Sequence, residues 1–203
     1  PLVNNNGGAF IYHVWPSGMT EQALVDGHVA KNLKTIYISA FEYTGFRSFR
    51  AIMELEPHFN NYGGLVFGSN WFNHTTLVNA AHAAGLKVVY AITIFNGASQ
   101  PDDPDTTGTH SDFLVNNLAP FIMNSLPEAD GIMLDYIRYD TGTWSESDKD
   151  LVSKICRRLR ERVGPKGVGL QELYACVWCS WGEDGAVGVG QRYSDFAIAM
   201  DYL

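Results

Sequence analysis

Six short apolar runs, separated by segments with helical periodicity, constrain the fold of this chain more than any other feature. Most of them are rich in Ile, Val, Tyr and Phe, as buried strands are. The predicted strands span residues 9–15, 35–41, 87–95, 131–137, 173–178 and 196–202. The helical patterns between them predict helices at 20–32, 75–84, 111–124 and 148–163, the last capped by Ser147 and ended by Gly164.

Strands that alternate with helices form parallel sheets, either closed as a barrel or open and doubly wound. After the first run the sequence reads Trp15-Pro16-Ser17-Gly18-Met19, which lacks the glycine fingerprint of a dinucleotide fold. We therefore expect an α/β fold of the TIM-type (β/α) barrel, with six of its eight strands apparent. Such barrels typically have about 250 residues. We expect residues 1–203 to form one barrel domain of a longer polypeptide.

Composition narrows the choice of partners. The chain has 14 basic and 22 acidic residues, a formal charge of -8, so a nucleic-acid partner is not expected. No apolar run approaches the roughly 20 residues of a membrane span. The three cysteines and six histidines show no spacing that favours a metal site. We expect no metal and no cofactor.

The fourth predicted strand ends in a carboxylate. In barrels of this type the active groups lie at the carboxyl ends of the strands, so Asp135 is the first candidate for catalysis. Arg138 would keep Asp135 ionised, because a nearby cation lowers the pKa of a carboxylate. Strict strand alternation places the two side chains on opposite faces, so this pairing requires the strand to end or bulge before Arg138. The alternative is that Asp135 only caps a loop.

Aromatic and polar side chains gather at or just beyond the predicted strand ends. Sugar-binding surfaces combine aromatic platforms with hydrogen-bonding groups. The candidate substrate-binding residues are Arg138, Tyr139, Tyr202, Tyr12, His13, Trp15, Asn96 and Trp178.

Glycoside hydrolysis ordinarily needs a second carboxyl group. Glu42 closes the second predicted strand with the parity of Ile36 and Ile38, and it is either a residue of the barrel mouth or a solvated loop residue. Asp201 closes the sixth, but it faces away from the site if Met200 faces inward. Both stay candidates, and the acid could also lie in strands outside this chain.

The segment Asp130-Gly131-Ile132-Met133-Leu134-Asp135-Tyr136-Ile137-Arg138-Tyr139 resembles the fourth strand, D-G-I-x-x-D-Y-I-R-Y, of a group of glycoside-hydrolase-like barrels in bacterial envelope glycosidases. The segment 81–88, Ala-His-Ala-Ala-Gly-Leu-Lys-Val, resembles the A-H-x-x-G-(I/L)-x-V that leads into their third strand. This resemblance implies a glycoside hydrolase of the cell envelope or the extracellular space.

A more distant resemblance is to the family-eighteen chitinases, whose fourth strand reads D-G-x-D-x-D-x-E and whose sixth reads M-x-Y-D. Met200-Asp201-Tyr202 fits the start of the second pattern. In the first pattern, Met133 stands where the middle Asp would be and Ile137 where the catalytic Glu would be. The resemblance therefore puts chitinase-type chemistry with that Glu in doubt.

Two functions remain open. The first is a glycoside hydrolase acting on a polysaccharide or cell-envelope glycan, with Asp135 as nucleophile or stabilising carboxylate. The second is a non-catalytic glycan-binding or structural barrel module, assembled with other chains of a cell-surface or virion assembly. The separation between Asp135 and any second carboxyl group distinguishes them.

Overall fold

The computed structural model describes part of the chain. The described residues are 8–11, 18–42, 65–67, 70–93, 95, 100–120, 123, 128–135, 137–139, 144–164, 171–175 and 190–201. Within these ranges no helix is long and apolar enough to cross a membrane.

A parallel sheet forms the centre of the described structure. Its strands are β1 (Gly8–Ile11), β2 (Thr35–Glu42), β5 (Lys87–Thr93), β6 (Gly131–Asp135) and β7 (Glu172–Ala175). They lie in the order β1-β2-β5-β6-β7, and every neighbouring pair is parallel. A separate antiparallel pair consists of β3 (Leu65–Phe67) and β4 (Asn70–Phe72). Five of the six predicted strands are thus confirmed as strands, and β2 ends at Glu42, one residue beyond its predicted end.

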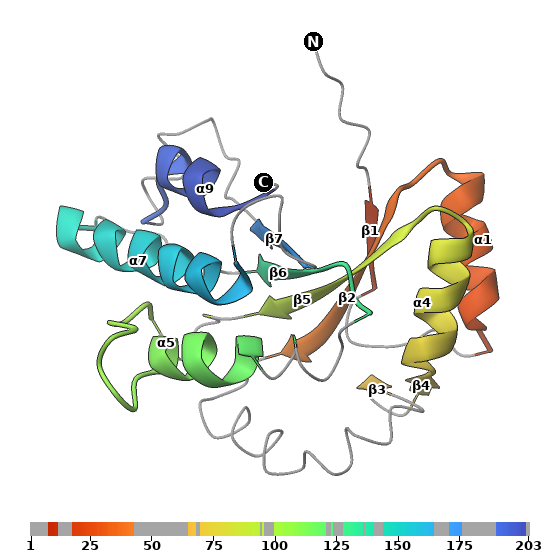
Figure 1. Cartoon of the computed structure of the whole chain (residues 1–203), viewed down its shortest axis with the longest axis horizontal. Helices are drawn as coiled ribbons and strands as arrows, with labels where there is room; N and C mark the ends of the chain where they lie inside the picture. The colour runs from red at the N-terminus through yellow and green to blue at the C-terminus, as the bar shows by residue number, and fades with distance from the viewer. Residues whose placement is uncertain are drawn as a thin grey trace.

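Helices flank the sheet (Figure 1). The elements α1 (Glu21–Ala30) and α4 (His74–Ala83) pack together at one end of it. At the other end lie α5 (His110–Phe113), the π-helical turn η1 (Leu114–Leu118), α7 (Glu146–Val163) and α9 (Tyr193–Ala199). The four predicted helices are confirmed as helical, although the third is divided between α5 and η1.

The two faces of the sheet have different partners. Alternate residues of the strands, among them Ile36, Val88, Ile132 and Leu173, share one buried cluster with the apolar side chains of the helices. The other alternate residues form a second cluster that, among the described residues, contains none from a helix. Its members are Tyr37, Val89, Ala91, Met133 and Tyr174. A doubly wound sheet carries helices on both faces, whereas a barrel carries them on one, so this arrangement favours a barrel.

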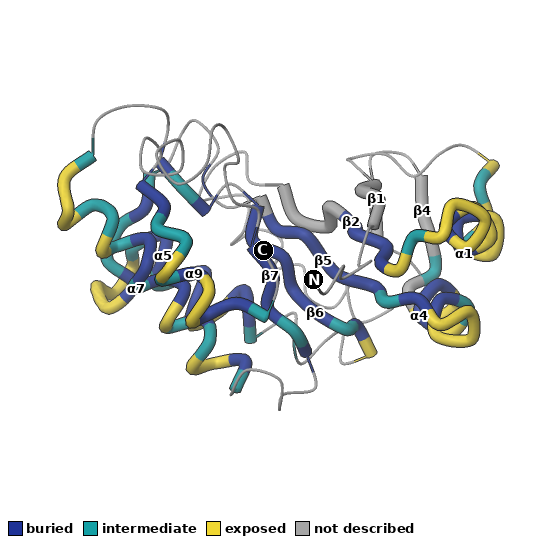
Figure 2. Tube along the Cα trace, turned by 90° about the horizontal axis from the view of Figure 1, so that it is seen from above, coloured by how far each residue is buried: buried dark blue, intermediate teal, exposed yellow. Residues whose placement is uncertain are grey.

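Both clusters are deeply buried, and Figure 2 shows β5 and β6 as the most continuously buried part of the chain. Tyr90 and Val89 lie on opposite faces of β5, and neither exposes any of its surface. A parallel strand covered on both sides reads as an unbroken apolar run, which is the pattern that predicted β5 and β6 from the sequence.

The sixth predicted strand is wrong, because α9 occupies most of 196–202. Phe196 and Ala199 are three residues apart and both are buried, whereas Ile198 between them exposes 73% of its surface. This is helical spacing, and a short apolar run does not by itself distinguish a strand from a helix. The backbone becomes extended only at Met200.

The cap of α7 lies two residues before the predicted Ser147. Ser145 accepts a hydrogen bond from the Asp148 backbone, and the Asp148 carboxylate accepts one from the Ser145 backbone. Both Ser145 and Ser147 have an aspartate three residues on, but Asp150 pairs with Arg192 instead. This reciprocal capping box fixes the start of α7.

The two segments that resemble envelope glycosidases, 81–88 and 130–139, contact each other at the amino end of β6. His82 of α4 lies 2.9 Å from the carboxylate of Asp130, and that carboxylate also accepts the Val88 backbone N–H at 2.7 Å. Gly131 follows with no room for a side chain, since a Cβ there would lie 2.5 Å from the Glu172 carbonyl oxygen. His82, Asp130 and Gly131 therefore join α4, β5, β6 and β7.

We expect Gly131→Ala to destabilise the protein by about 1–3 kcal/mol, because the new methyl group would overlap the β7 backbone. The matched control is Gly27→Ala on α1, where a Cβ would meet nothing within 4 Å. That change should stabilise the helix by about 0.5–1 kcal/mol. Urea unfolding of both variants measures the difference, and equal effects would contradict the close contact at Gly131.

Candidate active site

Asp135 is the last residue of β6, at the carboxyl end of the sheet. It lies on the same face as Gly131 and Met133, because side chains alternate along a strand. Met133 belongs to the cluster in which no described helix takes part, so Asp135 lies on the sheet face opposite the described helices. Its side chain is mostly buried, with 7% of the residue surface exposed. A carboxylate in this place is what the barrel hypothesis requires.

Glu42 and Asp135 lie in one row across three strands. The register pairs Glu42 of β2 with Thr93 of β5, and Thr93 with Asp135 of β6. Neighbouring strands are about 4.8 Å apart, so the Cα atoms of Glu42 and Asp135 are roughly 10 Å apart. The side chain of Glu42 lies outside the described part of the structure.

The parity expected for Glu42 changes within β2. Ser39 pairs with Ala91, but Phe41 pairs with the next residue, Ile92, so one residue of β2 is extra. Without this irregularity, Glu42 would keep the parity of Ile36 and Ile38. Because of the shift, the backbone of Glu42 pairs with Thr93. Thr93 is two residues after Ala91, so both belong to the same alternate set of positions on β5. Such bulges occur frequently beside active sites, where they redirect the chain.

The strand ends at Asp135, so Arg138 no longer follows strand alternation. Ile137 is fully buried in the helix-covered cluster. Arg138 is half-buried, and its Nη1 donates to the Tyr139 carbonyl oxygen at 3.3 Å. The pairing of Arg138 with Asp135 stays a prediction.

Tyr139 was expected to bind substrate, but the structure uses its side chain internally. The residue exposes 3% of its surface. Its hydroxyl donates to the Pro101 carbonyl oxygen at 3.0 Å, and its ring stacks on Trp144 with centroids 4.2 Å apart. With its ring covered and its hydroxyl bonded, Tyr139 is a buried contact between loops and not an open sugar platform.

Asp201 is also occupied elsewhere. Its carboxylate binds the Arg160 guanidinium at 2.5 Å and accepts the Leu173 backbone N–H at 2.8 Å. Leu173 pairs with Ile132, three residues before Asp135 on β6. Asp201 therefore ties the start of β7 to α7, and its catalytic role stays a prediction.

The remaining candidates lie outside the described residues. These are Tyr12, His13, Trp15, Asn96, Trp178 and Tyr202. Their placement at the mouth stays a prediction. Among the residues that are described, no three His, Cys, Asp or Glu side chains gather as a metal site.

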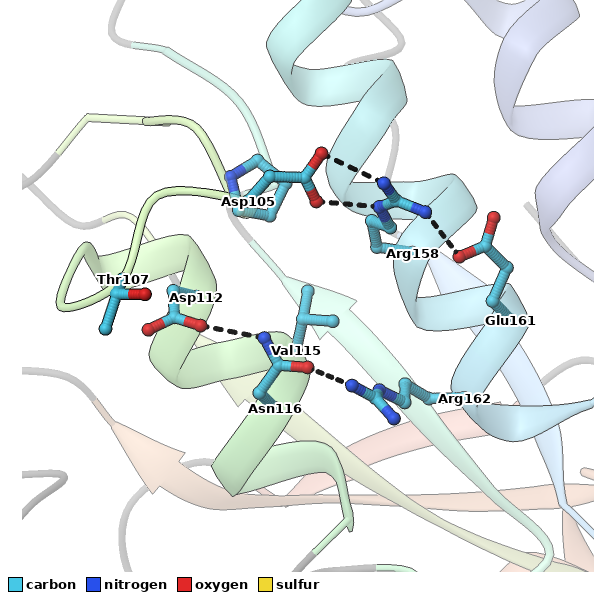
Figure 3. Close-up of a pocket in the computed structure, with 9 residues that line it drawn as sticks. Asp105, Thr107, Asp112, Val115, Asn116, Arg158, Glu161 and Arg162 are labelled. Atoms are coloured by element: carbon cyan, nitrogen blue, oxygen red, sulfur yellow. Dashed lines mark hydrogen bonds and ion pairs between the residues drawn. The ribbon is translucent and has the colours of Figure 1, made fainter.

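A cavity of about 470 Å³ lies among the covering helices, not on the face of Asp135 (Figure 3). Its charged groups are bound to one another. Arg158 donates to both carboxylate oxygens of Asp105, at 2.8 and 2.9 Å, and to Glu161, while Arg162 donates to Asn116. Since the guanidinium groups already have carboxylate or amide partners, the cavity is a weaker candidate for a ligand site than the end of β6.

No protein-family model and no curated protein sequence matches the chain. Solved structures with a similar fold include two glycan-degrading enzymes. One is a chitinase from Rhizomucor miehei, with 17% sequence identity and a TM-score of 0.58. The match covers 97% of this chain and 55% of the chitinase chain. The other is a spore cortex-lytic enzyme of Bacillus cereus, with 10% sequence identity and a TM-score of 0.55. The match covers 97% of this chain and 40% of the chain of that enzyme. The chain thus has a glycoside-hydrolase-like α/β fold and spans about half the length of these proteins or less.

We expect Asp201→Ala to lower the free energy of unfolding by about 3 kcal/mol, because it leaves Arg160 without its carboxylate in a mostly buried place. Asp150→Ala, which breaks an exposed pair with Arg192, should cost less than about 1 kcal/mol. Denaturant unfolding compares the two. Similar small losses would show that Asp201 does not hold β7 to α7.

We expect the Tyr139 phenol to lose its proton at a higher pH than an ordinary tyrosine. Burial raises the pKa of Tyr139 to about 12, and the carboxylates of Asp148 and Asp102 act in the same direction. An unfolded tyrosine has a pKa of about 10, so the stabilisation linked to the protonated phenol should be lost as pH rises from about 10 to 12. The tyrosinate absorbance of wild type minus Tyr139→Phe measures this titration. A transition near pH 10 would contradict the burial of the phenol.

Proposed function

We propose that this chain is the catalytic part of a glycoside hydrolase that acts on a polysaccharide or cell-envelope glycan outside the cytoplasm. The observation that carries the proposal is the place of Asp135, at the carboxyl end of β6 and on the sheet face opposite the described helices. Two enzymes with a similar fold are named for chitin and for spore cortex, and both names fit a glycan substrate.

Asp135 is the proposed nucleophile or the carboxylate that stabilises an oxocarbenium-like transition state. Glu42 is the proposed partner that protonates the leaving oxygen, because the register places it in the same row as Asp135. Carboxyl groups about 5 Å apart give retention, and larger separations of roughly 6.5–9.5 Å leave room for a water molecule and give inversion. Cα atoms about 10 Å apart are compatible with either outcome, since each side chain spans part of the distance.

A second function is favoured by one observation. Ile137 stands where the chitinase pattern has its catalytic Glu, and it is fully buried in the helix-covered cluster. That position supplies no acid in this chain. If Glu42 does not supply one either, we propose instead a glycan-binding or structural module within a cell-surface or virion assembly.

Release of reducing ends from chitin oligosaccharides and peptidoglycan fragments tests the first function. We expect Asp135→Asn to lower the rate at least about a thousandfold, because it removes the charge that the transition state needs. Glu42→Gln should act similarly, with partial recovery when the substrate carries a good leaving group that needs no protonation. The control is Asp150→Asn on α7, which should retain full activity.

Equal activity of wild type and Asp135→Asn would remove Asp135 from the reaction. Glycan binding by calorimetry with no hydrolysis in any variant would instead favour the binding module.

A further inference from the structure

Tyr139 lies where three loops of the sheet meet. The loop after β5 contributes Pro101, whose carbonyl oxygen accepts the Tyr139 hydroxyl at 3.0 Å. The loop after β6 contributes Tyr139 itself and Trp144, which stacks on its ring. The loop after β7 contributes Gly190, where an added Cβ would lie 2.6 Å from Cδ2 of Tyr139. One side chain therefore contacts all three connections at the carboxyl ends of β5, β6 and β7.

A second bond joins two of these loops. Gln191, beside Gly190, is fully buried and donates from Nε2 to the Ile137 carbonyl oxygen at 3.2 Å. Ile137 and Tyr139 are thus both held, one on each side of the half-buried Arg138. The backbone that follows Asp135 is fixed at two points by groups from the neighbouring loops.

The contact with Pro101 extends into the loop after β5. The next residue, Asp102, accepts the backbone N–H groups of His110 and Ser111 at 2.9 and 2.8 Å, which holds the start of α5. Further along the same loop, Asp105 binds Arg158 of α7 (Figure 3). Tyr139 therefore holds this loop at Pro101, and α7 holds it again at Asp105.

We infer that Tyr139 is a positioning residue, which fixes the loops after β5, β6 and β7 relative to one another and thereby holds Asp135 and Arg138 in place. Its effect on catalysis rests on the proposed function, but its effect on the loops does not. A tyrosine that only fills space would leave Pro101 and the start of α5 undisturbed when its hydroxyl is removed.

The test uses hydrogen exchange of the full chain, without any ligand. We expect Tyr139→Phe to speed exchange at the His110 and Ser111 amides about fivefold, the effect of losing one hydroxyl bond. The matched control is Tyr90→Phe, which removes a hydroxyl from a fully buried tyrosine in the middle of β5. It should leave these two amides unchanged. Tyr139→Phe keeps the ring, so the variant retains its stack on Trp144.

Gly190→Ala provides an independent variant in a different loop. The new methyl group should displace the Tyr139 ring. The backbone φ of residue 190, 77°, also disfavours any side chain. We expect it to speed exchange at His110 and Ser111 as well, although no described bond joins Gly190 to them. Unchanged exchange at these amides in both Tyr139→Phe and Gly190→Ala would overturn the inference.

Activity adds a separate readout. If wild type hydrolyses a glycan, Tyr139→Leu should lower kcat more than about tenfold with a smaller change in KM, and Tyr139→Phe should restore most of the rate. An unchanged kcat in Tyr139→Leu would overturn the positioning role in catalysis. A wild type that hydrolyses nothing contradicts the proposed function alone, because the exchange experiment still decides the role of Tyr139.

Discussion

The structure depends on the different covering of the two faces of its sheet. Every described helix longer than one turn contributes its buried apolar residues to the cluster that holds one set of alternate strand positions, which includes Ile36, Val88 and Leu134. The other set, which includes Val89 and Met133, is just as apolar and forms its own cluster. Among the described residues, helices cover one face of the sheet and apolar strand residues alone make up the cluster on the other, which is the covering of a (β/α) barrel and not of a doubly wound sheet. Asp135 lies at the carboxyl end of this second face.

Two features define the carboxyl end of the sheet. Backbone pairing aligns a row of residues across neighbouring strands, and side chains join the loops that follow the strands. Pairing places Glu42, Thr93 and Asp135 side by side, and the extra residue of β2 is what brings Glu42 into that row. Tyr139 and Gln191 then fix the chain that leaves β6. Preorganised groups of this kind are what catalysis by charge stabilisation requires, since they need no rearrangement during the reaction.

Local signals predicted those parts of the structure that local chemistry decides. The β-branched run of β5 and the cap and stop of α7 are properties of short segments, and they gave nearly correct bounds. The run at 196–202 failed because five apolar residues fit a helix as well as a strand. Asp135 was predicted from its place at a strand end. The partners of Asp201 and Tyr139, which are Arg160 and Pro101, lie about 40 residues away in the chain, and no local pattern indicates such pairings.

The proposed function requires a glycan to bind at the end of β6, beside Asp135. The most direct measurement is a crystal structure of the Asp135→Asn variant soaked with a chitin or peptidoglycan oligosaccharide. We expect a sugar ring within hydrogen-bonding distance of residue 135, on the face that also carries Met133. A sugar bound only in the cavity between α5 and α7, or on the helix-covered side of the sheet, would contradict it.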